Sequence, residues 1–229
     1  MNVAFIPVRG GSKSIPLKNI KEINGKPLVY WTALAAQKSN CIDKLVIATD
    51  SKEIKSIVNG FNFTKLEVYN RSAENSSDTS STESVMLEYI YNSNLKDDDL
   101  FFLIQATSPM LKAEYIDNMY KKYTKIDCDS MLSGVREKQF HWTFNKNDNN
   151  YITPINYDYK NRPRRQEFMG ILAENGACYI NTVKNIKKDK CRLSGKVSFY
   201  EMPSYTAYEI DEQEDWIIVE DLMHQFSNK

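Results

Sequence analysis

The sequence predicts an α/β fold with a doubly wound, mostly parallel sheet and a small inserted arm. Short apolar runs rich in β-branched and aromatic residues recur along the chain, as is typical of buried parallel strands. Segments with helical periodicity separate these runs, so we expect right-handed strand–helix–strand units. One long polar and aromatic stretch, residues 136–169, has no helical period and is therefore predicted to stand apart from the sheet.

The predicted elements alternate between strand and helix in the first half of the chain. Strands are expected at residues 3–8, 45–49, 66–69 and 100–104. A helix begins at Pro27, directly after the Asn24-Gly25 turn, and further helices are expected at residues 84–91 and 113–123. In the second half, strands are expected at residues 176–181 and 197–202, and a closing helix at residues 214–226.

The chain of 229 residues is long enough for one hydrophobic core, so we predict a single domain over residues 1–229. Residues 136–169 are predicted to form an arm, because a structureless insert of that length is uncommon in a compact domain. Aromatic patches mark contact surfaces, and two-fold pairing is the commonest oligomer symmetry. We therefore predict a homodimer whose arm crosses to the partner; the alternative is an arm that folds back on its own domain. The aromatic residues are Phe140, Trp142, Phe144, Tyr151, Tyr157 and Tyr159.

Composition excludes several classes of partner and chemistry. Thirty basic and 30 acidic residues give a net charge of zero, so the sequence has no electrostatic footprint for nucleic acid or an anionic membrane. No run approaches the roughly 18 apolar residues of a membrane span, and no basic segment precedes the first apolar run. The four cysteines lack metal-ligand spacing, and two histidines offer little for a Ser-His-Asp site. We expect a cytoplasmic protein with reduced thiols.

Polar residues follow each of the first four predicted strands. Asp50 follows the second strand, Arg71 the third and Gln105 the fourth. Ligands of open α/β sheets bind outside the carboxyl ends of the strands, so these side chains are expected at one edge. The loop after the first strand adds two glycines, which let backbone N–H groups point at an anion, and three cations that suit a polyphosphate. The loop residues are Arg9, Gly10, Gly11, Ser12, Lys13 and Lys18.

Each charged cluster also has an alternative interpretation. The glycine loop matches neither the P-loop nor the dinucleotide-binding fingerprint, and its alternative is a solvated basic turn. Glu209 and Asp211 place two carboxylates on one face of an extended segment, which suits Mg²⁺ beside a polyphosphate; the alternative is capping of the last helix together with residues 212–215. Arginines at positions 162, 164 and 165 suit a carboxylate or phosphate, and their alternative is an exposed basic loop.

Together these segments resemble the acylneuraminate cytidylyltransferase family, also called CMP-sialic acid synthetases. Five motifs occur in the order of that family: residues 6–19, Arg71 with residues 77–79, residues 105–109, residues 164–166 with 175–177, and residues 209–211. The resemblance implies a Rossmann-like nucleotidyltransferase fold whose arm serves dimerisation. It covers most of the chain and is weakest between residues 136 and 159.

The resemblance implies a role for each matching position. The nucleotide would be bound by Arg9, Gly10, Gly11, Ser12, Lys13, Lys18, Asn19, Arg71 and Thr82, with the phosphates at Arg9, Ser12, Lys13 and Lys18. The sugar would contact Gln105 and Arg165; the latter, donated by the arm of a second subunit, would meet the sugar carboxylate or the triphosphate. The metal, Mg²⁺, would be bound by Glu209 and Asp211. Catalysis would fall to Lys13, Lys18 and Asp211.

Three positions depart from the family pattern. Ser14 stands where glycine is usual, and Glu209 stands where aspartate is common. Leu111 stands where the family commonly has arginine, which leaves Lys112 as a candidate replacement. The longer side chain of Glu209 is expected to reach the metal through water.

The implied reaction is in-line attack of the anomeric hydroxyl of a nonulosonic acid on the α-phosphorus of CTP. It releases pyrophosphate and forms a CMP-sugar for surface glycan synthesis, and it depends on positioning and charge neutralisation. No dedicated general base is evident in the sequence. Three alternatives stay open: a cytidylyltransferase for the eight-carbon acid Kdo, a glycosyltransferase that binds metal through Asp127-Cys128-Asp129, and a regulatory module that binds CTP without turnover.

Overall fold

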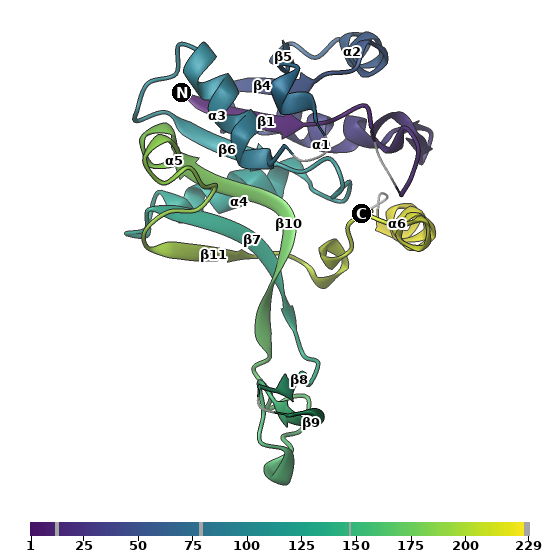
Figure 1. Ribbon diagram of the computed structural model, residues 1–229, viewed down its shortest axis with the longest axis vertical. Helices are drawn as coiled ribbons and strands as arrows, with labels where there is room; N and C mark the ends of the chain where they lie inside the picture. The colour runs from purple at the N-terminus through teal and green to yellow at the C-terminus, as the bar shows by residue number, and fades with distance from the viewer. Residues whose placement is uncertain (12–13, 78–79, 147, 227–229) are drawn as a thin grey trace.

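A seven-stranded sheet forms the centre of the molecule in the computed structural model, which describes residues 1–11, 14–77, 80–146 and 148–226 (Figure 1). Strand β10 runs antiparallel to its neighbours β6 and β7, while the remaining pairs are parallel, which confirms the predicted mostly parallel sheet. The strands lie in the order β11 (Val197–Glu201), β7 (Ser130–Glu137), β10 (Ile171–Thr182), β6 (Leu100–Ile104), β1 (Asn2–Pro7), β4 (Lys44–Thr49) and β5 (Leu66–Asn70).

Helices cover both faces of the sheet because alternate residues of the buried strands point to opposite sides. On one face, Ala4 and Ile6 of β1 share a core with three helices: α1 (Leu28–Lys38), α2 (Lys52–Asn59) and α4 (Ala113–Tyr123). On the other face, Val3 and Phe5 pack with α3 (Thr82–Asn92) and α5 (Val183–Asp189). The last helix, α6 (Gln213–Phe226), packs on a separate small core with Ile15, Ile23, Leu28 and Met110.

Two helices are absent from the sequence-based expectation. Helices α2 and α5 have eight and seven residues, too few for a clear periodic pattern. Each is instead defined by its N-cap: the Ser51 hydroxyl accepts from the Ile54 amide at 3.3 Å, and the Thr182 hydroxyl accepts from the Asn185 amide at 3.2 Å. The other expected helices agree with the structure to within a few residues, and α4 matches residue for residue.

The remaining elements are short. Two-stranded sheets pair β2 (Glu22–Ile23) with β3 (Lys26–Pro27), and β8 (Trp142–Asn145) with β9 (Asp148–Pro154). The 3₁₀ turns are η1 (Lys18–Ile20), η2 (Glu74–Ser76), η3 (Tyr159–Asn161) and η4 (Ser204–Ala207). No helix in the described ranges is long and apolar enough to cross a membrane. All four cysteines are free thiols.

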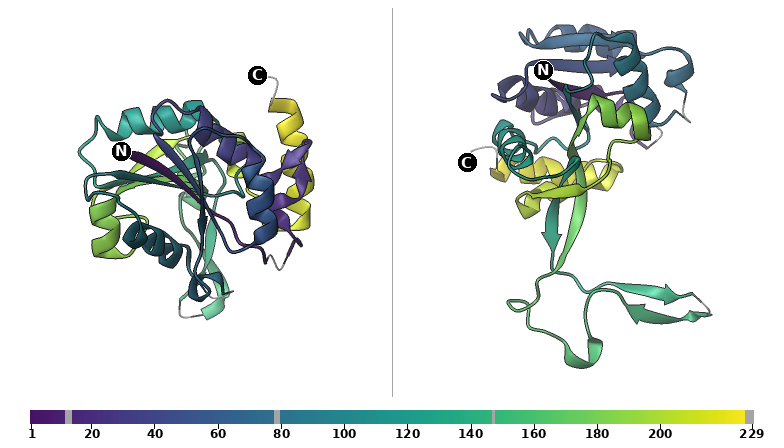
Figure 2. Two further views of the ribbon diagram at one scale, coloured as in Figure 1. Left: turned by 90° about the horizontal axis from the view of Figure 1, so that it is seen from above. Right: turned by 90° about the vertical axis from the view of Figure 1, so that its left-hand side faces the viewer.

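The arm leaves the sheet as a continuation of β7 and β10. These two strands stay paired as far as Glu137 and Ile171, so the first two residues of the predicted arm still belong to the sheet. Beyond them the chain projects away from the rest of the molecule and carries the β8–β9 hairpin (Figures 1 and 2). Phe140 stacks on Tyr157 at 4.1 Å and Arg162 lies over Phe140, which gives the arm a small core of its own. Phe144 and Tyr151 remain 66% and 67% exposed.

Candidate active site

A cavity of about 630 Å³ opens at the carboxyl ends of β1, β5 and β6. This is the edge at which the sequence predicts a ligand site. The structure gathers eight of the predicted site residues around the cavity: Arg9, Gly11, Lys18, Asn19, Arg71, Thr82, Gln105 and Asp211. Ser12 and Lys13 lie outside the described residues, so the centre of the glycine loop is not assigned a geometry.

Gly10 holds the start of the glycine loop against the end of β4. Its amide donates to Asp50 Oδ1 at 3.0 Å, and a Cβ at this position would lie 2.9 Å from the Ser51 Cβ. A larger residue would therefore push the loop away from Ser51. The Gly10 amide is engaged by Asp50, and the residues on either side of it, Arg9 and Gly11, border the cavity.

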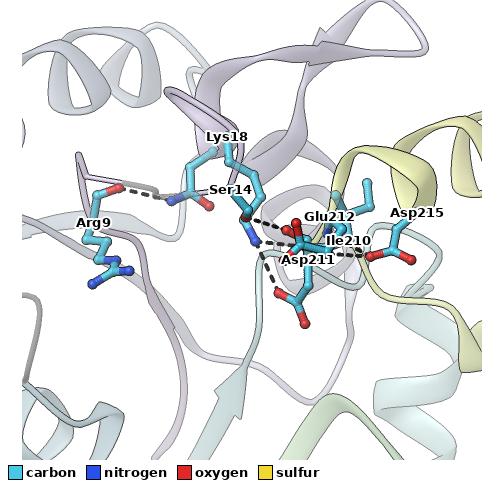
Figure 3. A network of polar contacts seen from close by, with 8 residues as sticks. Arg9, Ser14, Lys18, Ile210, Asp211, Glu212 and Asp215 are labelled. Carbon is cyan, nitrogen blue, oxygen red and sulfur yellow. Dashed lines mark hydrogen bonds and ion pairs between the residues drawn. The ribbon is translucent and has the colours of Figure 1, made fainter.

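Lys18 and Asn19 tie the glycine loop to its surroundings. The buried Asn19 amide donates to the Arg9 carbonyl at 3.1 Å, which fixes the backbone beside the Arg9 side chain (Figure 3). Lys18 Nζ donates to the Ile210 carbonyl at 2.9 Å and lies 3.1 Å from Asp211 Oδ1 (Figure 3). The Ser14 hydroxyl also donates to the Asp211 carbonyl at 2.5 Å. The serine that stands in place of the family's usual glycine thus joins the motif at residues 6–19 to the motif at residues 209–211.

The acidic residues near the C-terminus divide into two groups with different tasks. Asp215 Oδ2 accepts from the amides of Asp211 and Glu212 at 3.0 and 2.8 Å, so it caps the beginning of α6 (Figure 3). The Asp211 carboxylate instead faces Lys18 and lines the cavity, with 64% of its side chain exposed. Asp215 therefore caps the helix, whereas the Asp211 side chain does not.

Glu209 lies deeper than Asp211, against the end of β6. A Cβ on Gly176 would come 2.7 Å from Glu209 Oε2 and 3.3 Å from Gln105 Nε2, so this glycine leaves room for both side chains. The Ile210 amide donates to the Thr107 carbonyl at 2.8 Å and holds the segment in place. Burial raises the pKa of the Glu209 carboxyl, the charge of Asp211 raises it further, and Lys18 acts in the opposite direction.

Asn175, in the motif at residues 175–177, holds three elements of the structure together. Asn175 is 2% exposed. Its side-chain oxygen accepts from the Ser133 hydroxyl at 2.8 Å, and its side-chain nitrogen donates to the Thr206 carbonyl at 3.2 Å. Asn175 therefore links β7, the irregular part of β10 and η4. Through η4 it sets the position of the chain that leads to Glu209.

Arg71 is a half-buried cation of the cavity wall. Its Nε is buried and has no hydrogen-bond partner among the described residues, while one terminal nitrogen donates to the Asn75 carbonyl at 2.5 Å. Burial lowers the pKa of the Arg71 guanidinium, Asp50 and Glu88 raise it, and Arg9 lowers it. A guanidinium pKa lies so high that the group stays charged, so Arg71 presents a positive, partly desolvated donor to a ligand.

Glu209 and Asp211 form a donor set that fits Mg²⁺ in part. Two neighbouring carboxylates whose charges disfavour each other are stabilised by a divalent cation, which prefers charged oxygen ligands. Across the described parts of the chain, no three His, Cys, Asp or Glu side chains come close enough to form a metal cluster. A cation here would therefore need phosphate oxygens and water to complete its coordination, as Mg²⁺ usually does.

Some residues singled out by the sequence lie elsewhere. Arg165 is exposed and is not among the residues that line the cavity of its own chain; the arm that carries it projects away from the sheet (Figure 1). Leu111 is buried. Lys112 donates to the Phe226 carbonyl at 3.5 Å and lines a second, apolar cavity, not the cavity at the strand ends. Asp127 and Asp129 both contact Lys196, at 2.7 Å each, before the first residue of β7. That is the edge of the sheet opposite the cavity, so the D-x-D sequence has a structural role.

Part of the cavity wall is missing from the sequence-based prediction. Ser80 and Ser81 line the cavity, and the Ser81 hydroxyl caps α3 by accepting from the Ser84 amide at 3.0 Å. A serine directly before an apolar helical run is a recognisable N-cap signal, which identifies this position from sequence. Asp50 contacts the glycine loop and Glu88 contacts the loop after β5. These contacts depend on how the elements pack and have no comparable signal in sequence.

Comparisons with known proteins agree with this geometry. A family model described as cytidylyltransferase matches residues 3–215. The chain is 36% identical over 225 residues to N-acylneuraminate cytidylyltransferase B of Danio rerio, an alignment that covers 97% of this chain and 51% of that protein. It is 27% identical over 220 residues to N-acylneuraminate cytidylyltransferase of Streptococcus agalactiae, covering 95% and 52%. The chain thus spans about half the length of the curated relatives it matches.

Solved structures share the fold at low sequence identity. A CMP:2-keto-3-deoxy-manno-octonic acid synthetase complexed with CTP matches with a TM-score of 0.70 over 98% of both chains, at 19% identity. A 4-diphosphocytidyl-2C-methyl-D-erythritol synthase from Anaerococcus prevotii matches with a TM-score of 0.69, over 97% of this chain and 96% of that one, at 14% identity. At these identities the likeness concerns the fold alone.

Proposed function

This chain belongs to the cytidylyltransferase family, and on that premise we propose that it transfers CMP from CTP to the anomeric hydroxyl of a sialic-acid-type nonulosonic acid. Pyrophosphate is the second product. The observation that carries the proposal is the cavity at the strand ends, where Arg9, Lys18 and Arg71 meet Gln105 and Asp211. The likeness to relatives named N-acylneuraminate cytidylyltransferase supports the choice of sugar acid.

The cations of the cavity supply the electrostatic part of the mechanism. The triphosphate lies between Arg9, Lys18 and the glycine loop, which neutralise charge on the phosphate oxygens. The cytosine and ribose lie toward Asn19, Arg71 and Thr82. Nucleotidyl transfer needs little covalent help from protein groups, so the rate depends on aligning the attacking hydroxyl with the α-phosphorus and stabilising the charge that develops.

The sugar acid is proposed to bind beside Gln105, on the side of the cavity that leads to Glu209. Its carboxylate requires a cation, and we propose that Arg165 from the arm of a second subunit supplies it, in a homodimer. The projecting arm and its exposed aromatic residues support this arrangement (Figure 2). Four free cysteines suit a reducing compartment, and we propose a cytoplasmic location.

Mg²⁺ is the metal we propose for the Glu209–Asp211 pair. Asp211 would hold it directly, and Glu209 would contact it through water. When bound, the ion shields phosphate charge and lowers the pKa of a coordinated hydroxyl. Lys18 contacts Asp211, so its ammonium keeps that carboxylate oriented toward the phosphate side.

The proposal is tested by assaying pyrophosphate release from CTP and Mg²⁺ with a panel of sugar acids. We expect turnover with a nine-carbon acid, N-acetylneuraminic or legionaminic, and little with the eight-carbon acid Kdo. Turnover with Kdo alone would favour the second candidate, which the likeness to the CTP-bound octonic acid synthetase supports at the level of fold. Binding of CTP without turnover of any acid would contradict the enzymatic proposal.

A further inference from the structure

Glu88 of α3 anchors the loop that follows β5. Its Oε1 accepts from the Ser72 amide at 2.8 Å and from the Tyr69 hydroxyl at 2.9 Å. Its Oε2 accepts from the Ser72 hydroxyl at 2.7 Å and from the Asn75 side-chain amide at 2.5 Å. One carboxylate therefore satisfies four donors, and three of them belong to the loop.

The anchored loop carries a wall of the cavity. Asn75 is the shared element: its side chain donates to Glu88, and its carbonyl accepts from the Arg71 guanidinium at 2.5 Å. The buried Nε of Arg71 keeps its hydrogen-bonding capacity for another partner. The chain of contacts thus runs from helix α3 through Asn75 to a cation that lines the cavity.

We propose that Glu88 is a positioning residue for the nucleotide, one that fixes the loop and with it the Arg71 guanidinium before CTP arrives. The inference rests on the proposed function. A loop that is already ordered loses no conformational entropy at the moment of binding, so the free energy of binding is more favourable. Arg71 is assigned to the cytidine side of CTP, which does not change during the reaction. The effect is therefore expected in the affinity for CTP and not in the chemical step.

The chain contains a matched control for this role. Asp117 of α4 likewise accepts four hydrogen bonds from one loop, at 2.6 to 3.2 Å, from the Ser39 hydroxyl, the Asn40 amide and side chain, and the Cys41 amide. That loop follows α1 and leads into β4, at the edge of the sheet away from the cavity. Loss of Asp117 removes a comparable anchor without touching the cavity wall.

The test compares Glu88→Ala, Glu88→Gln and Asp117→Ala with the wild type in thermal melting, in calorimetric binding of CTP and in steady-state kinetics. We expect Glu88→Ala to raise the Kd and KM for CTP by about tenfold with kcat within about twofold, as lost charge-assisted hydrogen bonds predict. Glu88→Gln keeps the shape and an acceptor oxygen, so it is expected to recover part of the affinity. Asp117→Ala is expected to lower Tm while leaving the KM unchanged.

Two results would overturn the positioning role. One is an unchanged affinity for CTP in Glu88→Ala, or in Glu88→Gln should the alanine variant not fold. The other is an equal loss of affinity for CTP in Asp117→Ala, which would show that lower stability of the protein alone explains the weaker binding. Hydrogen exchange of the Ser72 and Asn75 amides adds a readout free of activity, since we expect faster exchange in Glu88→Ala only. A wild type that binds CTP but releases no pyrophosphate would sink the proposed function while leaving this comparison valid.

Discussion

Asp211 and Glu209 are two positions apart but have different surroundings. Asp211 is exposed and faces Lys18, whereas Glu209 is half-buried against Gly176. We expect Asp211→Asn to abolish magnesium-dependent turnover, because the amide keeps the shape of the ligand and loses its charge. Glu209→Gln is expected to cost about 10–100-fold, the usual loss for an outer contact of a metal. The measurement is rate against Mg²⁺ concentration, and a normal response in Asp211→Asn would remove the proposed metal site.

Gly176 offers a second prediction for a single residue. Its φ of +65° is unfavourable for a side chain by about 1–2 kcal/mol, and an added Cβ would meet Glu209 and Gln105. We expect Gly176→Ala to lower both Tm and kcat/KM. Gly25→Ala is the control, since Gly25 has a φ of +74° but a Cβ added there would meet no atom within 4 Å. A loss of kcat/KM in Gly25→Ala equal to that in Gly176→Ala would show that backbone strain alone explains the effect.

Sequence predicts well which residues reach one edge of the sheet when they directly follow a strand. Arg9, Arg71 and Gln105 follow strands whose carboxyl ends meet at one edge, and all three line the cavity. Lys112 lies outside this cavity, because the turn after β6 directs its side chain toward the Phe226 carbonyl. The direction in which a turn presents a side chain has no signature in sequence. Glu88 is likewise hidden, since its role depends on which loop packs beside α3.

Among the elements, the loop anchored by Glu88 gives a pH-dependent prediction. Burial acts to raise the pKa of Glu88, but hydrogen bonds from Ser72, Asn75 and Tyr69 outweigh it and hold the pKa below its usual value. A depressed pKa contributes stability above the unfolded value of about 4.3, and that contribution is lost as pH falls through the folded value.

The free energy of unfolding of the wild type minus that of Glu88→Gln is therefore expected to be largest at neutral pH and to shrink below about pH 4.3. Urea unfolding at pH 7, 5, 4 and 3 measures this difference, since the contribution is lost as the pH falls below the unfolded value and through the folded one. A difference that stays constant over this range would mean that the charge of Glu88 does not stabilise the loop.

The boundaries of an element were predictable where a periodic apolar pattern extends over many residues. They were not predictable where a few polar contacts, such as an N-cap, define the element. Helix α4 agrees with its predicted range, because residues such as Ile116 and Met119 repeat on one buried face. Helix α5 depends on the Thr182 cap and has only Val183 and Ile186 buried. Strand β10 is longer than predicted because its first residues pair with β7 outside the main core, where the polar sequence of Glu174 and Asn175 hides the strand.

At the scale of the whole molecule, the arm leads to a prediction about assembly. A projecting hairpin with exposed Phe144 and Tyr151 is poorly stabilised alone, and apolar surface of this kind is usually covered by a partner. We expect a homodimer in sedimentation at micromolar concentration. Phe144→Ser with Tyr151→Ser is expected to shift the protein toward monomer without lowering the Tm of the sheet domain. A monomeric wild type would contradict the crossing of Arg165 into a second active site.

The overall architecture was the most predictable feature, since strands and helices alternate in sequence and alternate residues of each buried strand pack into two different cores. The path of the arm was not predictable, because beyond Glu137 its aromatic residues pack against each other. The sequence therefore indicates that residues 136–169 differ from the rest, while their direction follows from the extension of β7 and β10.

The central claim is that the strand-end cavity joins CMP to a sugar acid, and labelled CTP tests it most directly. The protein is incubated with Mg²⁺, N-acetylneuraminic acid and CTP that carries ³²P at either the α or the γ position. We predict that the α label moves into a new CMP-sugar while an equal amount of γ label appears as pyrophosphate. Label that stays in CTP with every nonulosonic acid, or α label released as free CMP without a sugar, would contradict the account.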